Sequence, residues 1–276
     1  LVAHYFSASS HAAGKYSEGD VAPGYWDGLI GPGKAVDTNK YFVISTDNLA
    51  NVQANNPMII TTGPRSINPE TGKQWGMDFP AYTFRDMAGI QKEFITEQLG
   101  IKKLHAIMGA SAGGFIAQSW AVEYPEMLDN VIGVITNPQN PVLTSFTVLQ
   151  HAMRAIAMDP KWQDGNYADG EGPTEGLELA IQMMNAGAFT EEFYENTYKR
   201  DSGEVSTYAD IHEPTAYEKQ LGEGIKVGAA AIDASHWYYT SRATMMHDLA
   251  HNHESLEKAL DKITANVLMV SCTRDY

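Results

Sequence analysis

The chain has a single cysteine, Cys272, among its 276 residues, so it cannot form an internal disulfide. Stable disulfides belong to oxidising compartments, and a chain without them fits a reducing one. No apolar run approaches the roughly 18 to 20 residues that a membrane-spanning helix needs, and no signal peptide is visible. The sequence therefore favours a protein that works without a membrane.

Positive charge is also scarce. The chain has 19 lysines and arginines against 34 aspartates and glutamates, which gives a net charge of −15. Binding to nucleic acid needs a basic surface that displaces counterions from the phosphates, so nucleic acid is not expected as a partner. Hydrophobic residues make up 43% of the chain, which is enough for a sizeable core.

Both ends of the sequence have the character of cut ends. The chain begins at Leu1, without an initiator methionine and inside a strand-like run, and it stops at Tyr276 just after another strand-like run. We therefore expect a fragment of a longer protein that lacks both ends.

Short apolar runs alternate with helical patterns. Strands that alternate with helices predict a parallel α/β sheet with helices on its faces. The predicted buried strands are residues 1–5, 41–45, 104–108, 131–135 and 267–270, and the predicted helices are residues 84–99 and 114–124.

Two stretches interrupt this alternation. Residues 46–82 are rich in Asn, Pro and Gly, and ordered loops of that length in a compact domain are usually functional. Residues 140–253 contain amphipathic, Met-rich segments and no strand pattern, which predicts a helical cap. We therefore divide the chain into a first part of the core (1–139), the cap (140–253) and a continuation of the core (254–276).

One turn in the core carries a candidate nucleophile. An apolar strand runs into Gly109-Ala-Ser-Ala-Gly113 and then directly into a helix. A strand, G-x-S-x-G and a helix in this order form a nucleophile elbow, in which the serine, here Ser111, takes a positive φ between small neighbours. Gly113 and Gly114 would let the helix approach the strands. The alternative is a tight turn in which Ser111 only caps the helix.

A catalytic serine needs an oxyanion hole, a base, and an acid that orients the base. We predict that the backbone N–H groups of Ala112 and Phe6 form the oxyanion hole, with Ser7 as the next candidate after Phe6. Asp275, just after a predicted strand, is the candidate acid, although an ordinary surface carboxylate is the alternative. The chain order Ser, Asp, His then places the histidine beyond residue 276.

Three other motifs are expected to have no catalytic role. His4 is predicted to brace the loop that contains Phe6. The stretch His247-Asp-Leu-Ala-His251-Asn-His253 has two histidines four residues apart at the end of an apolar helix, but an aspartate stands where a zinc peptidase needs glutamate. Gly31-Pro-Gly-Lys34 lacks the spacing of a phosphate-binding loop. We therefore predict no metal site.

Several segments of the chain resemble the homoserine O-acetyltransferase family, acyltransferases of the α/β-hydrolase fold. They are Tyr25-Trp-Asp-Gly-Leu-Ile-Gly-Pro-Gly-Lys-Ala-Val-Asp-Thr38, Thr62-Gly-Pro-Arg-Ser-Ile-Asn-Pro-Glu-Thr-Gly72, Asp78-Phe-Pro80 and Arg85-Asp-Met87. This resemblance implies a Ser–Asp–His triad with Ser111 as nucleophile and Asp275 as acid. It also implies a helical cap, acetyl-CoA as co-substrate with no bound cofactor, and a cytoplasmic homodimer formed through the cap that serves methionine biosynthesis.

The chain departs from that family's pattern at two positions. The family usually has Met after the nucleophile, and Ala112 keeps the N–H while making the pocket wall smaller. Phe189 falls, in an ungapped alignment from residue 176, where the family has an arginine that binds the acceptor's carboxylate. Loss of such a charge-assisted contact removes about 1.5 to 3 kcal/mol. Phe189 is thus a candidate substrate-contacting residue, and the acyl acceptor stays open.

Three functions are consistent with these residues. The first is acyl transfer from acyl-CoA to the hydroxyl of a small acceptor, and the second is ester hydrolysis, in which water replaces the acceptor. The third is a non-catalytic binding protein, since this fold does not guarantee chemistry. We also expect residues 1–276 alone to be aggregation-prone and practically inactive, because they lack the base and expose a sheet edge.

Overall fold

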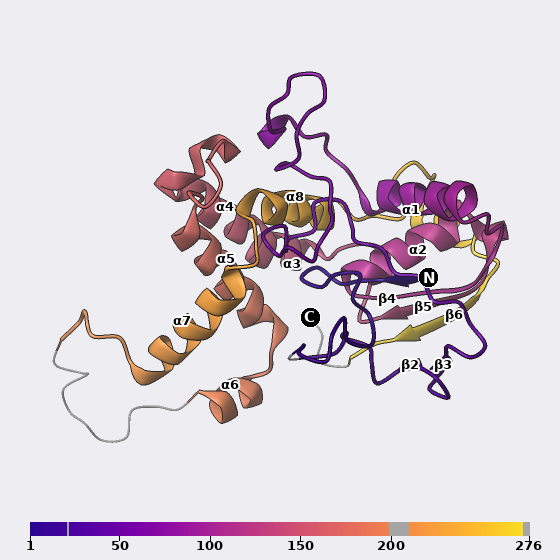
Figure 1. Ribbon diagram of the computed structural model, residues 1–276, viewed down its shortest axis with the longest axis horizontal. Helices are drawn as coiled ribbons and strands as arrows, with labels where there is room; N and C mark the ends of the chain where they lie inside the picture. The colour runs from indigo at the N-terminus through magenta and orange to yellow at the C-terminus, as the bar shows by residue number, and fades with distance from the viewer. Residues whose placement is uncertain (21, 199–209, 273–276) are drawn as a thin grey trace.

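The structure is a computed structural model that describes residues 1–20, 22–198 and 210–272. Its centre is a parallel four-stranded sheet with the order β1-β4-β5-β6 (Figure 1). In register, Met108 pairs with Val2 and Ile132, and Ile132 pairs with Leu268. The predicted parallel α/β sheet is therefore confirmed. Its strands are β1 (Val2–Ala3), β4 (Leu104–Ala110), β5 (Leu128–Val134) and β6 (Asn266–Val270).

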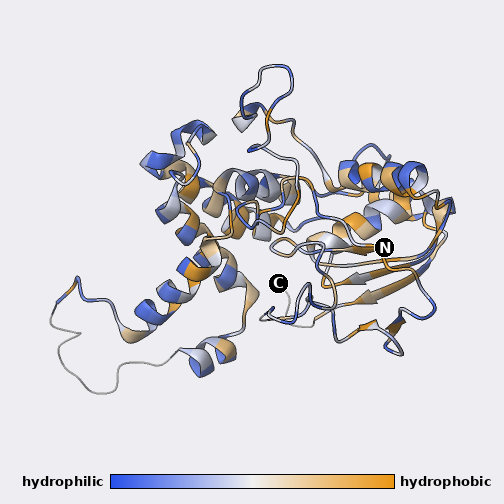
Figure 2. Ribbon diagram, viewed as in Figure 1, coloured by the Kyte–Doolittle hydropathy of each residue, from blue (hydrophilic) through white to orange (hydrophobic). Residues whose placement is uncertain are grey.

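Two helices cover one face of this sheet, as Figure 1 shows. They are α1 (Phe84–Glu93), which continues as the π-helical turn η2 (Phe94–Gln98), and α2 (Ala112–Glu123). Eleven of the twelve residues of α2 are buried, and its Trp120 indole donates to Gln91 of α1 at 2.9 Å. The colours of Figure 2 show that β5 and β6 are largely apolar. The core thus lies between the sheet and these two helices, both of which the sequence predicts.

The cap consists of helices that follow β5 and lie beyond the carboxyl ends of the strands (Figure 1). Its own core is built from aromatic and aliphatic side chains that include Ile156, Trp162 and Trp237. The predicted helical character of this region is confirmed, whereas the domain boundaries stay a prediction. The elements are α3 (Val142–Thr144), η4 (Ser145–Gln150), α4 (His151–Met158), η5 (Pro160–Gly165), α5 (Thr174–Ala188), α6 (Glu191–Thr197), α7 (Ala216–Ala229) and α8 (Ala234–Met245).

Five short elements complete the described chain. They are β2 (Ile30–Gly31), β3 (Val36–Asp37), η1 (Gly76–Asp78), η3 (Pro125–Met127) and α9 (Leu256–Leu260). In the turn between β2 and β3, Lys34 forms an ion pair with Asp27 at 3.2 Å. The lysine of the Gly31-Pro-Gly-Lys34 motif is thus held by a carboxylate.

Two strand predictions need correction. Residues 41–45 do not form a buried strand: Ser45 alone makes a bridge to Val2, and Phe42 is 78% exposed. This segment only follows the outer edge of the two-residue strand β1, which offers too short a ladder. The strand at 267–270 exists as β6, but its five residues are exposed, because it is the edge of the sheet and no described element covers its outer face.

Residues 46–82 are ordered without regular strands, as predicted. Apart from η1, the segment consists of turns. It is tied to α8 of the cap along its length: Asp233 donates its N–H to Val52, Thr240 donates its hydroxyl to Ala50, and Tyr239 donates to Phe79. The segment therefore connects the core to the cap.

Candidate active site

The turn between β4 and α2 has the backbone of a nucleophile elbow. Ser111 lies between the end of β4 at Ala110 and the start of α2 at Ala112, with φ 49° and ψ −120°. The predicted positive φ is confirmed. Ser111 is exposed, and its side chain does not cap α2. The alternative in which this serine only caps the helix is therefore wrong, and its hydroxyl makes no hydrogen bond within the described ranges.

The glycines around Ser111 are required by close backbone contacts. A Cβ on Gly109 would lie 2.2 Å from the carbonyl of Gly113, and a Cβ on Gly113 would lie 2.1 Å from the carbonyl oxygen of Ala3. A Cβ on Gly114 would lie 2.5 Å from Thr136, which follows β5. Such distances leave no room for a larger residue, so the small residues bring α2 against β1, β4 and β5.

The Phe6 loop lies directly beside the elbow. A Cβ on Gly113 would also be 2.9 Å from the carbonyl oxygen of His4, two residues before Phe6. A turn in which Ala8 donates its N–H to Tyr5 at 3.1 Å shapes this loop. Within the described part of the chain, the N–H groups of Phe6 and Ala112 donate to no acceptor. One unpaired donor thus directly follows Ser111 and the other lies in the loop beside the elbow. Their joint use as an oxyanion hole stays a prediction.

His4 is a structural residue, as predicted. It is 1% exposed, its Nδ1 bonds the carbonyl of Tyr5 at 2.8 Å, and its Nε2 accepts the N–H of Asn48 at 3.1 Å. Desolvation lowers the pKa of His4, so the ring is neutral at pH 7. Since both ring nitrogens are engaged, His4 holds the loop in place and cannot serve Ser111 as a base.

The acid and base of the predicted triad are not placed. Asp275 lies outside the described residues. β6, which precedes it, ends beside β5, where Ile135 donates its N–H to Val270 at 2.7 Å. The nine histidines of the chain all lie in the described ranges, and none of them bonds Ser111 there. The base therefore stays a prediction for sequence beyond residue 276.

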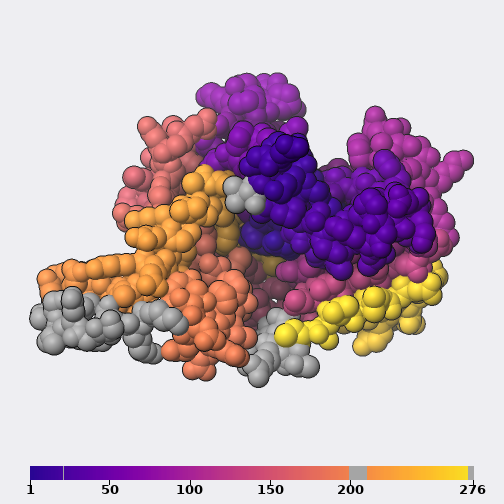
Figure 3. Space-filling view, turned by 60° about the horizontal axis from the view of Figure 1, so that its bottom comes forward, coloured from indigo at the N-terminus to yellow at the C-terminus, as the bar shows by residue number. Residues whose placement is uncertain are grey.

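The carboxyl ends of β4, β5 and β6 all point toward the cap in Figure 1. Ligands of open parallel sheets bind at this edge. Figure 3 shows the surface hollowed between the indigo N-terminal loops and the cap. The elbow therefore stands at the edge where a substrate would enter between core and cap.

The histidine-rich stretch at residues 247–253 does not lie at the end of a helix, although the sequence predicts this. Helix α8 ends at Met245, and residues 247–253 form turns in which Asp248 accepts the N–H of Ala250. The histidines therefore do not share a helix face. His247 is 6% exposed and stacks on Phe115 of α2 at 4.0 Å, and its Nε2 bonds the carbonyl of Asn137.

The described residues contain no group of three His, Cys, Asp or Glu side chains that could hold a metal ion. In the same part of the chain, no helix has the length and apolar character needed to span a membrane.

Phe189 lies in the cap, just after α5. Its side chain is 46% exposed and stacks on Phe193 of α6 at 4.3 Å. A contact of Phe189 with substrate stays a prediction.

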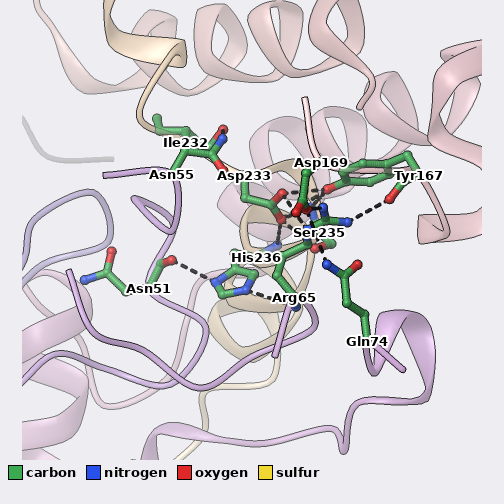
Figure 4. Close-up of polar contacts among 10 residues, drawn as sticks. All are labelled: Asn51, Asn55, Arg65, Gln74, Tyr167, Asp169, Ile232, Asp233, Ser235 and His236. Carbon is green, nitrogen blue, oxygen red and sulfur yellow. Dashed lines mark hydrogen bonds and ion pairs between the residues drawn. The ribbon is translucent and has the colours of Figure 1, made fainter. Parts of the chain in front are cut away.

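A buried polar cluster where the cap meets residues 46–82 was missed from the sequence (Figure 4). Asp233 is 4% exposed and caps α8 by accepting the N–H groups of Ser235 and His236. It also accepts the hydroxyl of Tyr167 at 3.0 Å and lies 3.6 Å from the guanidinium of Arg65. An aspartate just before an apolar helix was the available signal, because it is a typical N-cap.

Arg65 connects this cluster to a cavity of about 340 Å³ between α5, α7 and the start of α8. Its guanidinium bonds the carbonyl of Tyr167 at 2.8 Å, pairs with Asp169 and lies over the Tyr167 ring at 4.8 Å. Lys226 and Glu178 also line the cavity. This mixed lining could hold a small polar molecule.

Known proteins are similar in sequence to this chain over its whole length. A profile of the α/β-hydrolase fold matches residues 21–229. A homoserine O-acetyltransferase of Deferribacter desulfuricans is 36% identical over 280 residues, which cover all of this chain and 71% of that protein. One of Methanococcoides burtonii is 34% identical over 282 residues, and this chain spans only 55% of its length.

Two groups of solved structures share the fold closely. The crystal structure of homoserine O-acetyltransferase from Bacillus anthracis has 55% sequence identity and a TM-score of 0.96, and the match covers 99% of this chain and 73% of that one. The structure of esterase E22 has 41% identity and a TM-score of 0.92, with 98% and 73% covered.

Proposed function

The chain belongs to the homoserine O-acetyltransferase family of the α/β-hydrolase fold, and from that premise we propose that it is the catalytic part of a serine-dependent acyltransferase. One observation carries the proposal: Ser111 stands at a positive φ without a capping bond, next to the N–H of Ala112 and beside the loop that carries the N–H of Phe6, and neither N–H has an acceptor in the described ranges. Such a turn presents the serine oxygen to a substrate at the edge of the sheet.

In the proposed reaction, the oxygen of Ser111 attacks the thioester carbonyl of acetyl-CoA while its proton passes to the histidine expected beyond residue 276. The N–H groups of Phe6 and Ala112 stabilise the oxyanion, and Asp275 orients the histidine. The carbon–sulfur bond then breaks, and the histidine gives the proton to the sulfur, so that CoA leaves as the thiol. In the second half, the hydroxyl of the acceptor attacks the acetyl-serine ester and gives its proton to the histidine. The bond between the acetyl carbon and the serine oxygen breaks, the histidine returns the proton to Ser111, and the acceptor leaves as the acetyl ester.

The test is the variant Ser111→Ala in the full-length protein. It should form no acetyl-enzyme with acetyl-CoA by intact mass and should not turn over, because no other group takes the place of the attacking oxygen. Ser119→Ala is the matched control on the same helix, since the Ser119 hydroxyl only bonds the carbonyl of Phe115 at 2.8 Å. An acetyl-enzyme on Ser111→Ala would end the proposal.

Ester hydrolysis is the second candidate, favoured by the similarity to esterase E22 and by the absence of an arginine at Phe189. The two reactions use the same residues and differ in whether water reaches the acetyl-serine. Purified enzyme with acetyl-CoA and homoserine separates them: acetylated homoserine identifies a transferase, and free acetate alone identifies a hydrolase. A protein that forms no acetyl-enzyme at all would be a binding protein of this fold.

We further propose that the protein acts as a cytoplasmic homodimer joined through the cap. Exposed apolar side chains on α3 and η4 support a contact there, since Val142, Leu143 and Phe146 are 84%, 65% and 55% exposed. The full-length protein should therefore sediment as a dimer, and Leu143→Asp should shift it to the monomer. Equal sedimentation of both forms would contradict a contact through the cap.

A further inference from the structure

Trp237 of the cap contacts Phe6, whose backbone N–H is one of the two unpaired donors. The ring of Phe6 meets the indole of Trp237 edge to face, with centroids 4.8 Å apart and planes at 74°. Trp237 belongs to α8 and is 2% exposed within the core of the cap. Edge-to-face contacts between aromatic rings stabilise a structure beyond the area that they bury. The Phe6 loop therefore rests on the cap.

Trp237 is itself held firmly, because α8 is anchored at its first turn (Figure 4). Asp233 caps the helix, and its own N–H donates to Val52 at 2.9 Å. His236 bonds the carbonyl of Asn51 at 2.9 Å, and Arg65 lies against Asp233. Trp237 is the next residue of α8 after His236, so these bonds also fix the position of its indole.

The segment after α8 reaches the other side of the elbow. His247 stacks on Phe115, which lies in the first turn of α2 after Ala112. α8 and the residues that follow it thus contact both segments that carry the unpaired N–H groups. This part of the cap therefore supports both segments, in addition to the direct contact between the elbow and the Phe6 loop at Gly113.

We propose that Trp237 is a positioning residue that fixes the N–H of Phe6 for the reaction at Ser111, an inference that rests on the proposed function. Other bonds hold the flanks of the loop: His4 bonds Tyr5, and Gln53 donates to Ser7 at 2.6 Å. The side chain of Phe6 packs against the core of the sheet on one side and against the cap core, through the ring of Trp237, on the other. An oxyanion donor is effective only when it is preorganised within about 0.5 Å, so loss of this contact weakens the transition state more than the ground state.

The experiment compares Trp237→Leu, Trp237→Phe and the control Trp162→Leu in the full-length protein. Trp162 is a second buried cap tryptophan, 5% exposed and stacked on Tyr238. We expect Trp237→Leu to lower kcat about tenfold or more with little change in KM. Trp237→Phe should keep most activity, because it keeps an aromatic ring there and the indole N–H has no partner in the described ranges. Trp162→Leu should lose stability but keep kcat.

The affinity for a transition-state analogue is a measurement that should not change if Trp237 has only a structural role. A trifluoromethyl ketone adds to Ser111 and places its oxyanion at the donors. Its affinity should fall in Trp237→Leu by the same factor as kcat/KM, and Phe6→Leu combined with Trp237→Leu should be no worse than either change alone. Equal kcat losses in Trp237→Leu and Trp162→Leu, or additive losses in the double variant, would overturn the proposal.

Hydrogen–deuterium exchange separates this inference from the proposed function. Residues 4–9 should exchange faster in Trp237→Leu than in the wild type, and Trp162→Leu should leave them unchanged. If the wild type forms no acetyl-enzyme, the proposed function fails, but the exchange still decides whether Trp237 holds the loop. Unchanged exchange of residues 4–9 in Trp237→Leu would refute the positioning role.

Discussion

His247 shows how burial makes one side chain a source of pH-dependent stability. Desolvation is the largest cause that lowers the pKa of His247, to about 4 from its ordinary 6.5, and the carbonyl of Asn137 only partly opposes it. The unfolded chain thus binds the proton more readily than the folded one. The stabilising contribution is complete above pH 6.5 and is lost as the pH falls toward 4.

We therefore expect the free energy of unfolding to fall by about 3 kcal/mol through His247 alone between pH 6.5 and 4, at 1.36 kcal/mol per pKa unit. Urea denaturation across this range measures the slope. His247→Phe can still stack on Phe115, and it should reduce the slope of the unfolding free energy against pH by the equivalent of one proton. The remaining slope should come from His4 and His236, whose pKa values burial also lowers. An unchanged slope in the variant would contradict this account.

At the scale of the residue, the sequence predicted the turn at Ser111 because the pattern that indicates it is local. The apolar strand, the small residues and the helix occur within about a dozen consecutive positions, and the backbone follows from them. Arg65 and Asp233 gave no comparable signal. Their partners lie far away in the sequence, as in the contact between Arg65 and His236 across 171 positions, and periodicity carries no information about such pairs.

At the scale of elements, α8 depends on its N-cap. Asp233→Ala removes the cap and leaves the guanidinium of Arg65, whose side chain is 14% exposed, without its buried carboxylate partner. Breaking a buried pair costs about 3 kcal/mol or more, so the variant should lose at least that much stability in urea denaturation. Asp233→Asn should lose less, because an amide oxygen can still accept from Ser235 and His236.

The control for this variant is a cap on the surface. Thr190 caps α6 by accepting the N–H of Phe193, and Thr190→Ala should cost only about 1 kcal/mol. Equal losses at both caps would show that Asp233 acts only as a helix cap, without a contribution from the buried cluster.

Helices were predicted correctly where the helical periodicity of apolar residues extends over several turns, as in α1 and α2. The strand expected at 41–45 failed because an apolar run does not reveal whether a neighbouring strand is long enough to pair with it. The apolar helix that was expected to end with the histidine-rich stretch at 247–253 ends at Met245 instead. There the chain turns to bond residues 138 and 140 through Leu249 and His247, and this tertiary pairing overrides helix propensity.

At the scale of the molecule, β6 leaves an apolar edge open. Its residues Val267, Leu268, Met269 and Val270 are 44 to 54% exposed. Exposed apolar edge strands pair with other chains, so residues 1–276 expressed alone should self-associate. Light scattering during chromatography should show oligomers that become fewer in Leu268→Lys.

Ile211→Lys is the matched control for this prediction. Ile211 is 95% exposed but lies outside the sheet, so a charge there should leave self-association unchanged. A monodisperse wild-type chain, or equal effects of the two lysines, would contradict the role of β6.

The contact between Phe6 and Trp237 also sets an order of events during synthesis. Phe6 leaves the ribosome long before Trp237 and its anchor at Asp233, which follow only after α5 and α7 have been made. Contacts between such distant positions form late and slow the folding of a chain. A nascent chain can shape the turn at Ser111 early, yet its Phe6 loop waits for the cap. An unfinished chain would thus carry the turn at Ser111 before the contact between Phe6 and Trp237 can form.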